Sequence, residues 1–187
     1  MPKLHSRAVF VSFRSGDIAH AERLHDHLAI WLGREEIFLD REPGNIRVTD
    51  DFLKVIKAAV EGAEILIALI GPAWASNENL IRLNDPEDVV RFELGRAFER
   101  AAAGERIAII PVLVGGAQMP RATDSSPAQL LDLVKIQALT IPDESTAYRE
   151  GLSRLLDAID RHSPGLRPRR QNTWLREALS SPDESRA

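Results

Sequence analysis

Residues 8–13 read AVFVSF, and the stretch RSGD follows them at positions 14–17. A short apolar run that ends at turn-forming residues is typical of a strand buried on both faces of a parallel sheet. Beyond it, apolar residues recur at helical spacing until Gly33, and Asp17 stands where a residue would cap that helix. This part of the chain therefore predicts a strand, a loop and a helix, in that order.

The same unit recurs along the rest of the chain. Further apolar runs predict strands over residues 37–39, 65–70, 107–114 and 136–141. Amphipathic spacing predicts helices over residues 49–62, 86–104, 128–133 and 148–159. A polar loop that carries Trp74 is expected after the third strand. Because parallel strands need right-handed helical crossovers, we expect an α/β fold with a five-stranded parallel sheet and helices on both faces.

Length and composition limit the domain organisation. The chain has 187 residues, of which 44% are hydrophobic and 28% are charged, and these values favour one ordinary domain with a tail. We expect the domain to span residues 1–162 and a basic and polar tail to span residues 163–187. That tail could be a frayed end or a linker to a second, C-terminal domain. The chain contains no cysteine, which excludes disulfide frameworks, thiolate metal sites and cysteine nucleophiles.

Charge and hydropathy limit the partners. A net charge of -4 gives no basic field for nucleic-acid phosphates, so nucleic acid is an unfavoured partner. The first residues lack the apolar run of a signal peptide, and the longest apolar run is too short to cross a bilayer. We therefore expect a cytoplasmic protein without membrane contact. His20, His25 and His27 lack the spacing of a metal-binding pattern, so we expect no metal site.

Several nucleotide-binding patterns are missing from the sequence. Neither G-x-G-x-x-G nor G-x-x-x-x-G-K-[ST] is present, which excludes a dinucleotide fingerprint and a P-loop. A response-regulator receiver would need acidic residues after its first strand, an aspartate after its third and a lysine after its fifth, and this chain lacks that set. Ligands of open parallel sheets bind beyond the carboxyl ends of the strands, so the residues that follow each strand are the candidates.

Three short motifs stand at the predicted strand ends and on one predicted helix. They are VFVSFR at residues 9–14, DREPG at 40–44 and DVVRFEL at 88–94. In this order they resemble conserved boxes of Toll/interleukin-1 receptor (TIR) domains, and the last is similar to the segment of prokaryotic members that carries a glutamate. The resemblance covers about residues 6–160. It implies a flavodoxin-like three-layer fold, in agreement with the alternation of strands and helices.

The resemblance also implies an activity. A prokaryotic TIR domain of this kind would cleave the bond between nicotinamide and ribose in NAD(+), giving nicotinamide and linear or cyclic ADP-ribose, in bacterial defence or signalling and after self-assembly. NAD would be the substrate, without a cofactor or metal. Glu93 would be catalytic, binding ribose hydroxyls and stabilising an oxocarbenium-like transition state. The residues expected to bind substrate are Phe13, Arg14, Ser15, Asp40, Trp74 and Asp88. The loop expected to act in assembly or gating consists of Asp40, Arg41, Glu42, Pro43, Gly44 and Asn45.

Individual residues also allow structural interpretations. Val89 stands four residues before Glu93, where many NAD-cleaving members have tryptophan. Arg14 could pair with Asp40, and Phe13 could belong to the core. Glu93 could be an ordinary helix residue that pairs with a neighbouring arginine, the candidates being Arg91, Arg96 and Arg100.

The whole chain also allows two other functions. It could be a non-catalytic interaction module that associates with itself or with other TIR domains. It could also be a nucleoside deoxyribosyltransferase-like enzyme, which likewise places a glutamate at the strand ends, but the D-x-x-P-G loop gives that interpretation no support.

Overall fold

The computed structural model describes residues 7–39, 50–74 and 76–166. Within these residues the chain forms one parallel five-stranded sheet in the order β2-β1-β3-β4-β5. The strands are β1 (Val9–Ser12), β2 (Ile37–Leu39), β3 (Ile65–Ile70), β4 (Ala108–Leu113) and β5 (Leu139–Thr140). The predicted α/β class and the all-parallel sheet are confirmed.

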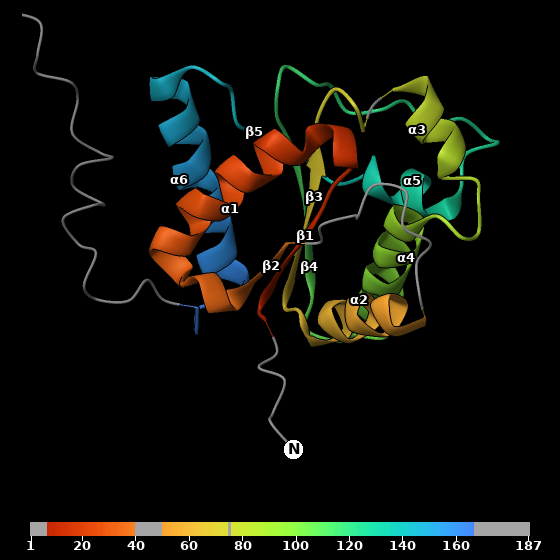
Figure 1. Ribbon diagram of the computed structural model, residues 1–187, viewed down its shortest axis with the longest axis horizontal. Coiled ribbons are helices and arrows are strands. Elements are labelled where there is room, and N and C mark those ends of the chain that lie inside the picture. The colour runs from red at the N-terminus through yellow and green to blue at the C-terminus, as the bar shows by residue number, and fades with distance from the viewer. Residues whose placement is uncertain (1–6, 40–49, 75, 167–187) are drawn as a thin grey trace, which may run out of the picture.

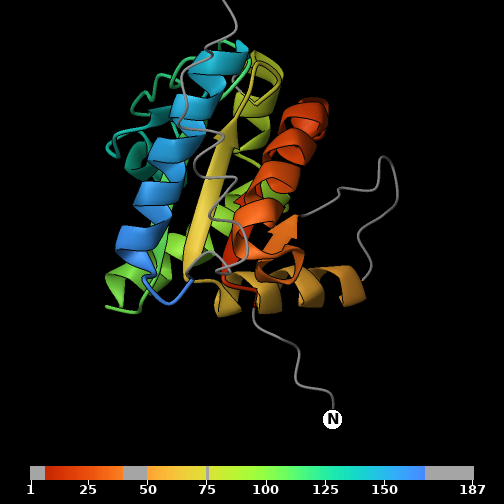
Figure 2. The ribbon, with the colours of Figure 1, turned by 90° about the vertical axis from the view of Figure 1, so that its left-hand side faces the viewer.

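The helices form a layer on each face of this sheet (Figures 1 and 2). On one face lie α1 (Ile18–Leu32) and α6 (Ser145–His162), and on the other lie α2 (Asp50–Gly62), α4 (Val89–Ala102) and α5 (Ala128–Leu133). A short helix, α3 (Asn77–Arg82), and two turns of 3₁₀ helix, η1 (Ser15–Asp17) and η2 (Arg34–Glu36), complete the described elements. The result is the expected three-layer, flavodoxin-like arrangement.

The alternation of side chains along the strands divides the core into two clusters. Val9 and Val11 pack on the side of α1 and α6, whereas Phe10 packs on the side of α2, α4 and α5. All six residues of β3 are buried, and they too alternate between the two clusters. Because helices cover both faces of the sheet, the sequence of this strand is a continuous run of apolar residues. By the same alternation, Ser12 at the end of β1 faces the helix layer that contains α4.

The structure differs from the sequence-based expectation at two elements. The polar loop predicted after β3 contains α3, which begins where the Ser76 hydroxyl accepts a hydrogen bond from the Asn79 N–H. That helix is short and mostly polar, so hydrophobic spacing does not reveal it. The fifth strand was predicted over residues 136–141, but only two residues, Leu139 and Thr140, pair with β4. Thr49, where the helix over residues 49–62 was expected to begin, lies outside the described residues.

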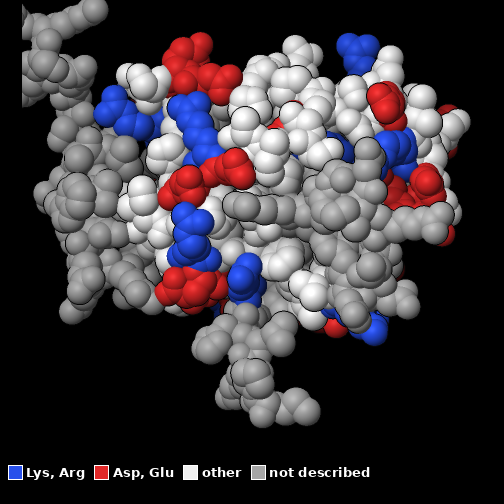
Figure 3. All heavy atoms as spheres, viewed as in Figure 1, with Lys and Arg blue, Asp and Glu red and all other residues white. Residues whose placement is uncertain are grey.

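The surface carries charges of both signs. On the face shown in Figure 3, basic and acidic side chains are interspersed. None of the helices in the described ranges combines the length and the apolar character that a bilayer crossing requires.

Helices α1 and α6 are joined by a contact around Tyr148. Its hydroxyl lies 3.0 Å from His27 Nδ1, and the Arg23 guanidinium lies 3.8 Å from the centre of its ring. Burial raises the pKa of Tyr148 to about 12, from an ordinary value of 10.0. A phenol whose pKa is higher in the folded state than in the unfolded state favours folding until it ionises in the unfolded chain.

We therefore expect the free energy of unfolding to fall between about pH 10 and pH 12 through Tyr148, by about 2 kcal/mol at most. Tyr148→Phe should lose less stability than the parent over this interval, because phenylalanine does not ionise. Urea unfolding of both proteins near pH 9 and near pH 11.5 measures the difference. An equal loss of stability in both proteins would contradict the expectation.

Candidate functional site at the carboxyl end of the sheet

A serine and a glutamate meet between β1 and α4. Ser12 is the last residue of β1 and lies opposite Ala68 of β3 in the parallel register. Its hydroxyl donates a hydrogen bond to Glu93 Oε2. Both residues are only 1% exposed. The predicted catalytic carboxylate therefore lies at the carboxyl end of the sheet, as expected, but it points inward to a strand residue.

Helix α4 carries Glu93 on the side that faces the sheet. The buried apolar positions Val90, Leu94 and Ala97 follow helical spacing, and Glu93 lies on the same stripe. The helix begins after Asp88, whose Oδ1 accepts a hydrogen bond of 2.9 Å from the Arg91 N–H. A carboxylate among apolar side chains experiences a low local dielectric, in which its charge acts strongly on nearby groups.

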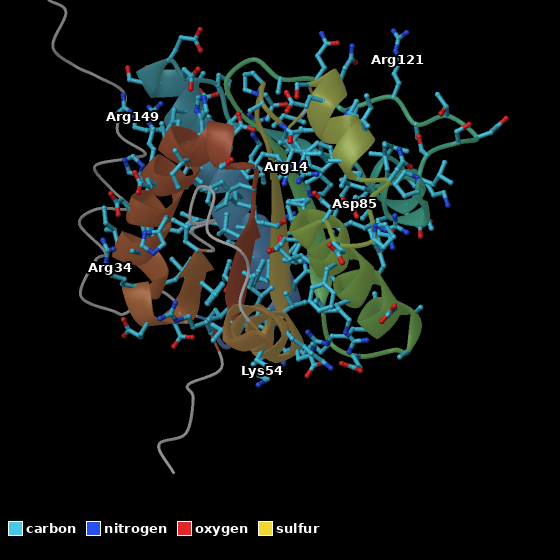
Figure 4. All side chains as sticks on the ribbon, turned by 45° about the vertical axis from the view of Figure 1, so that its right-hand side comes forward. Arg14, Arg34, Lys54, Asp85, Arg121 and Arg149 are labelled. Carbon is cyan, nitrogen blue, oxygen red and sulfur yellow. The ribbon has the colours of Figure 1, made fainter. Side chains whose placement is uncertain are left out.

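Arg14 and Asp88 form a buried ion pair next to this contact. Arg14 Nη1 lies 2.6 Å from Asp88 Oδ2, and Arg14 Nη2 lies 3.2 Å from Asp88 Oδ1. Arg14 Nη2 also donates to the backbone oxygen of Asn79 at 3.3 Å. Both side chains of the pair are 1% exposed. Figure 4 places Arg14 between the start of α1 and the helices α3 and α4.

The expected helix cap Asp17 has a different role. Its side chain makes no capping hydrogen bond to α1. Instead, Asp17 Oδ1 accepts from the Ala73 N–H at 2.9 Å, and Oδ2 accepts from the Trp74 N–H at 2.7 Å. Asp17 does stand at the N-cap position of α1, as predicted, but its buried carboxylate bonds two amides of the loop after β3 in place of those of the helix.

This contact requires a glycine at position 71. A Cβ atom on Gly71 would lie 2.4 Å from the Asp17 side chain, which is closer than side chains approach one another. A Cβ atom on Gly16 would similarly lie 2.6 Å from the Cβ of Ala73. The segments after β1 and β3 thus lie too close together for a side chain at Gly16 or Gly71, and the Asp17 carboxylate holds the backbone of Ala73 and Trp74.

The two aromatic residues predicted to bind substrate lie in different parts of the core. Phe13 is 5% exposed and belongs to the cluster beneath α1 and α6, whereas Trp74 is 1% exposed and belongs to the cluster beneath α2, α4 and α5. The structure therefore does not bring them together as two walls of one site. Ser15 is exposed, in the turn η1.

The arginines proposed as structural partners of Glu93 make other contacts. Arg91 donates to the backbone oxygens of Leu83 and Asn84. Arg96 pairs with Glu61 and Glu99. Arg100 pairs with Glu105 and donates to two backbone oxygens of the α2 end. The contact with Ser12 is the hydrogen bond that joins the Glu93 carboxylate to β1.

A comparison with known families identifies the chain. A family model of the TIR domain matches residues 9–156, which is most of the sequence. The chain belongs to the TIR domain family. A search of curated proteins returned no match.

Other features of this TIR domain can now be placed. Val89, at the position where many NAD-cleaving members have tryptophan, belongs to the same apolar cluster as Trp74. Among the described residues, no group of three or more histidine and carboxylate side chains could hold a metal ion. Asp40 and the rest of the 40–45 loop lie outside the described residues, so their roles stay predictions.

The partner of Glu93 and the neighbour of Asp17 were not anticipated from the sequence. Ser12 is a polar residue at the end of an apolar strand, and Glu93 is a polar residue on an apolar helix stripe. Two buried polar groups on facing surfaces are expected to pair. That signal could have linked Ser12 to Glu93, whereas nothing in the local sequence marks Gly71 as the neighbour of Asp17.

Proposed function

We propose that this TIR domain is an NAD(+) hydrolase in which Glu93 is the catalytic residue. The observation that carries the proposal is the position of this carboxylate, on a buried helix stripe at the carboxyl end of a TIR sheet. Carboxyl ends of parallel strands are where ligands bind in this class of fold. A helix glutamate in that place offers negative charge to a cation that forms during reaction.

The reaction needs little more than such a charge. The bond between ribose C1′ and the nicotinamide nitrogen breaks, and its electron pair goes to that nitrogen, which removes the positive charge of the pyridinium ring. The ribose then carries oxocarbenium character, which a nearby carboxylate stabilises. A water oxygen bonds to C1′ and releases one proton, which gives ADP-ribose. Attack by an adenine nitrogen in place of water gives the cyclic product.

The burial of Glu93 has a consequence for this mechanism. At 1% exposure its carboxylate cannot reach a ribose until the surrounding side chains move. We attribute that movement to self-assembly, which is the activation that the family resemblance implies. Of the residues expected to contact NAD, Ser15 is exposed, whereas Phe13, Arg14, Trp74 and Asp88 are buried and would form the frame of the site. Such an enzyme would act in the cytoplasm, in defence or signalling.

The burial of Glu93 also favours a second function. If Glu93 and Arg14 serve only to hold β1 against α4, the domain is a non-catalytic module that associates with TIR domains. Membership of the family fits this function as well.

An assay of the parent protein at several concentrations separates the two functions. The full chain is incubated with NAD(+), nicotinamide is resolved by chromatography, and light scattering records the assembly state. We expect nicotinamide release that rises more steeply than protein concentration. Assembly without any release, at every concentration and with a crowding agent, would contradict the hydrolase and support the interaction module.

A further inference from the structure

We infer that the ion pair of Arg14 and Asp88 positions Glu93 for reaction and does not itself bind the substrate. This inference rests on the proposed hydrolase function, and it assigns the pair a role different from the substrate contact that the sequence suggested. It follows from how two contacts connect the same two segments of the chain.

The first step is the geometry of those segments. Ser12 and Arg14 lie two residues apart at the end of β1, and Arg14 has extended backbone angles, with φ -93° and ψ 142°. Two residues of extended chain span about 6.6 Å. Asp88 and Glu93 lie five residues apart at the start of α4, which corresponds to about 7.5 Å along a helix axis. Because the two spans are nearly equal, both contacts between strand and helix can form at the same time: Ser12 with Glu93, and Arg14 with Asp88.

The second step is the double use of the Asp88 carboxylate. Oδ1 accepts from the Arg91 N–H and so fixes where α4 begins. The same carboxylate holds the Arg14 guanidinium. Together with the packing of Val90, Leu94 and Ala97 against the sheet, the two contacts restrict rotation and sliding of the helix against the strand. With the start of α4 fixed to β1, the side chain of Glu93 is held toward the end of that strand, where it accepts the hydrogen bond from Ser12.

The third step is energetic. A buried ion pair contributes little net stability, because desolvation of both charges offsets their attraction. Arg14 also keeps one buried donor, Nε, without a hydrogen-bond partner among the described residues. Arg100, at the other end of α4, shows a more completely bonded arrangement, because its Nε pairs with Glu105 and its Nη1 donates to Val60 and Ala63. Because the ion pair of Arg14 and Asp88 contributes so little to stability, its role is better explained by the geometry that it imposes on β1 and α4.

The test uses Arg14→Lys, which keeps the charge, and Asp88→Asn, which keeps a helix-capping side chain. Arg100→Lys is the matched control, since it alters a buried arginine of the same layer far from Glu93. The first readout needs no turnover: the full chain is labelled with ¹³C at glutamate carboxyl groups, and the Glu93 signal is assigned by its loss in Glu93→Gln. We expect this signal to shift by more than its linewidth in Arg14→Lys and Asp88→Asn, and to stay in place in Arg100→Lys.

The second readout is the kinetics of nicotinamide release. Displacement of a reacting group by about 1 Å can lower a rate by about 100-fold, so we expect kcat to fall between about 10-fold and 100-fold with KM nearly unchanged. A raised KM with an unchanged kcat would show that Arg14 binds substrate and would overturn the inference. An unmoved Glu93 signal in both folded variants would also overturn it.

One further outcome separates the positioning role from the hydrolase function. A shifted Glu93 signal in a protein that releases no nicotinamide would support the positioning role and count against the hydrolase function. If Asp88→Asn does not fold because the Arg14 charge is left buried without its partner, the double variant Arg14→Gln with Asp88→Asn replaces it, because it removes both charges and keeps a helix-capping side chain.

Discussion

Replacing Glu93 with glutamine is expected to lower the rate of nicotinamide release by at least about 100-fold, because removal of one preorganised electrostatic group commonly costs that much. Glutamine keeps the length of the side chain and can still accept the hydrogen bond from Ser12. The substitution therefore removes charge and little else. Chromatography of nicotinamide under conditions where the parent is active measures the effect.

Stability must be followed in the same experiment. Exchange of a buried carboxylate for a neutral group of equal shape removes a desolvation cost along with a favourable contact, so we expect a change in unfolding free energy below about 1.5 kcal/mol. Glu99→Gln is the control, since Glu99 lies on the same helix and its side chain is 66% exposed. Parental activity in a folded Glu93→Gln protein would exclude Glu93 as the catalytic residue.

Gly71→Ala is expected to destabilise the fold by roughly 2–4 kcal/mol, the sum of overpacking and of two amides that lose their acceptor. The added methyl would lie 2.4 Å from the Asp17 side chain, which receives the N–H groups of Ala73 and Trp74. Neither the carboxylate nor the backbone of the loop can move away without breaking these bonds. Chemical denaturation of the parent and the variant gives the difference.

A double variant shows whether the clash is the cause. In the Asp17→Ala background the obstructing side chain is gone, so Gly71→Ala should add little further loss of stability. Gly165→Ala serves as the control, because a Cβ atom there meets nothing within 4 Å. If the losses from Asp17→Ala and Gly71→Ala were simply additive, the two residues would not be coupled in the way that the structure indicates.

The elements of the fold that could be predicted are those whose own residues show a clear pattern of apolar and polar side chains. Strand β3 was predicted with its observed bounds, since a run of six apolar residues between Glu64 and the turn-forming pair Gly71-Pro72 has few alternatives. Helix α5 and strand β2 were likewise placed as observed. Strand β5 was not, because its length depends on how far it can pair with β4 and not on its own composition.

The candidate site was predictable only as a set of residue types. Strand order and helix direction place Glu93 and Arg14 at the same edge of the sheet, and that part of the prediction followed from the alternation of elements. The partners did not follow, because Arg14 and Asp88 are separated by 74 residues and Asp17 and Trp74 by 57. A charged residue can pair with any of several candidates, and the choice depends on packing that short-range patterns do not record.

The edges of the sheet have a consequence for how copies of this domain would meet in the proposed self-assembly. The two outer strands, β2 and β5, have only three and two residues. Strands so short offer few free backbone groups to a neighbouring chain, and this is one way in which proteins avoid edge-to-edge aggregation. Association that continues the sheet from one molecule to the next is therefore disfavoured in the described part of the chain. Contacts between copies should use side chains of helices and loops, and such contacts are more readily reversed than a shared ladder of backbone hydrogen bonds.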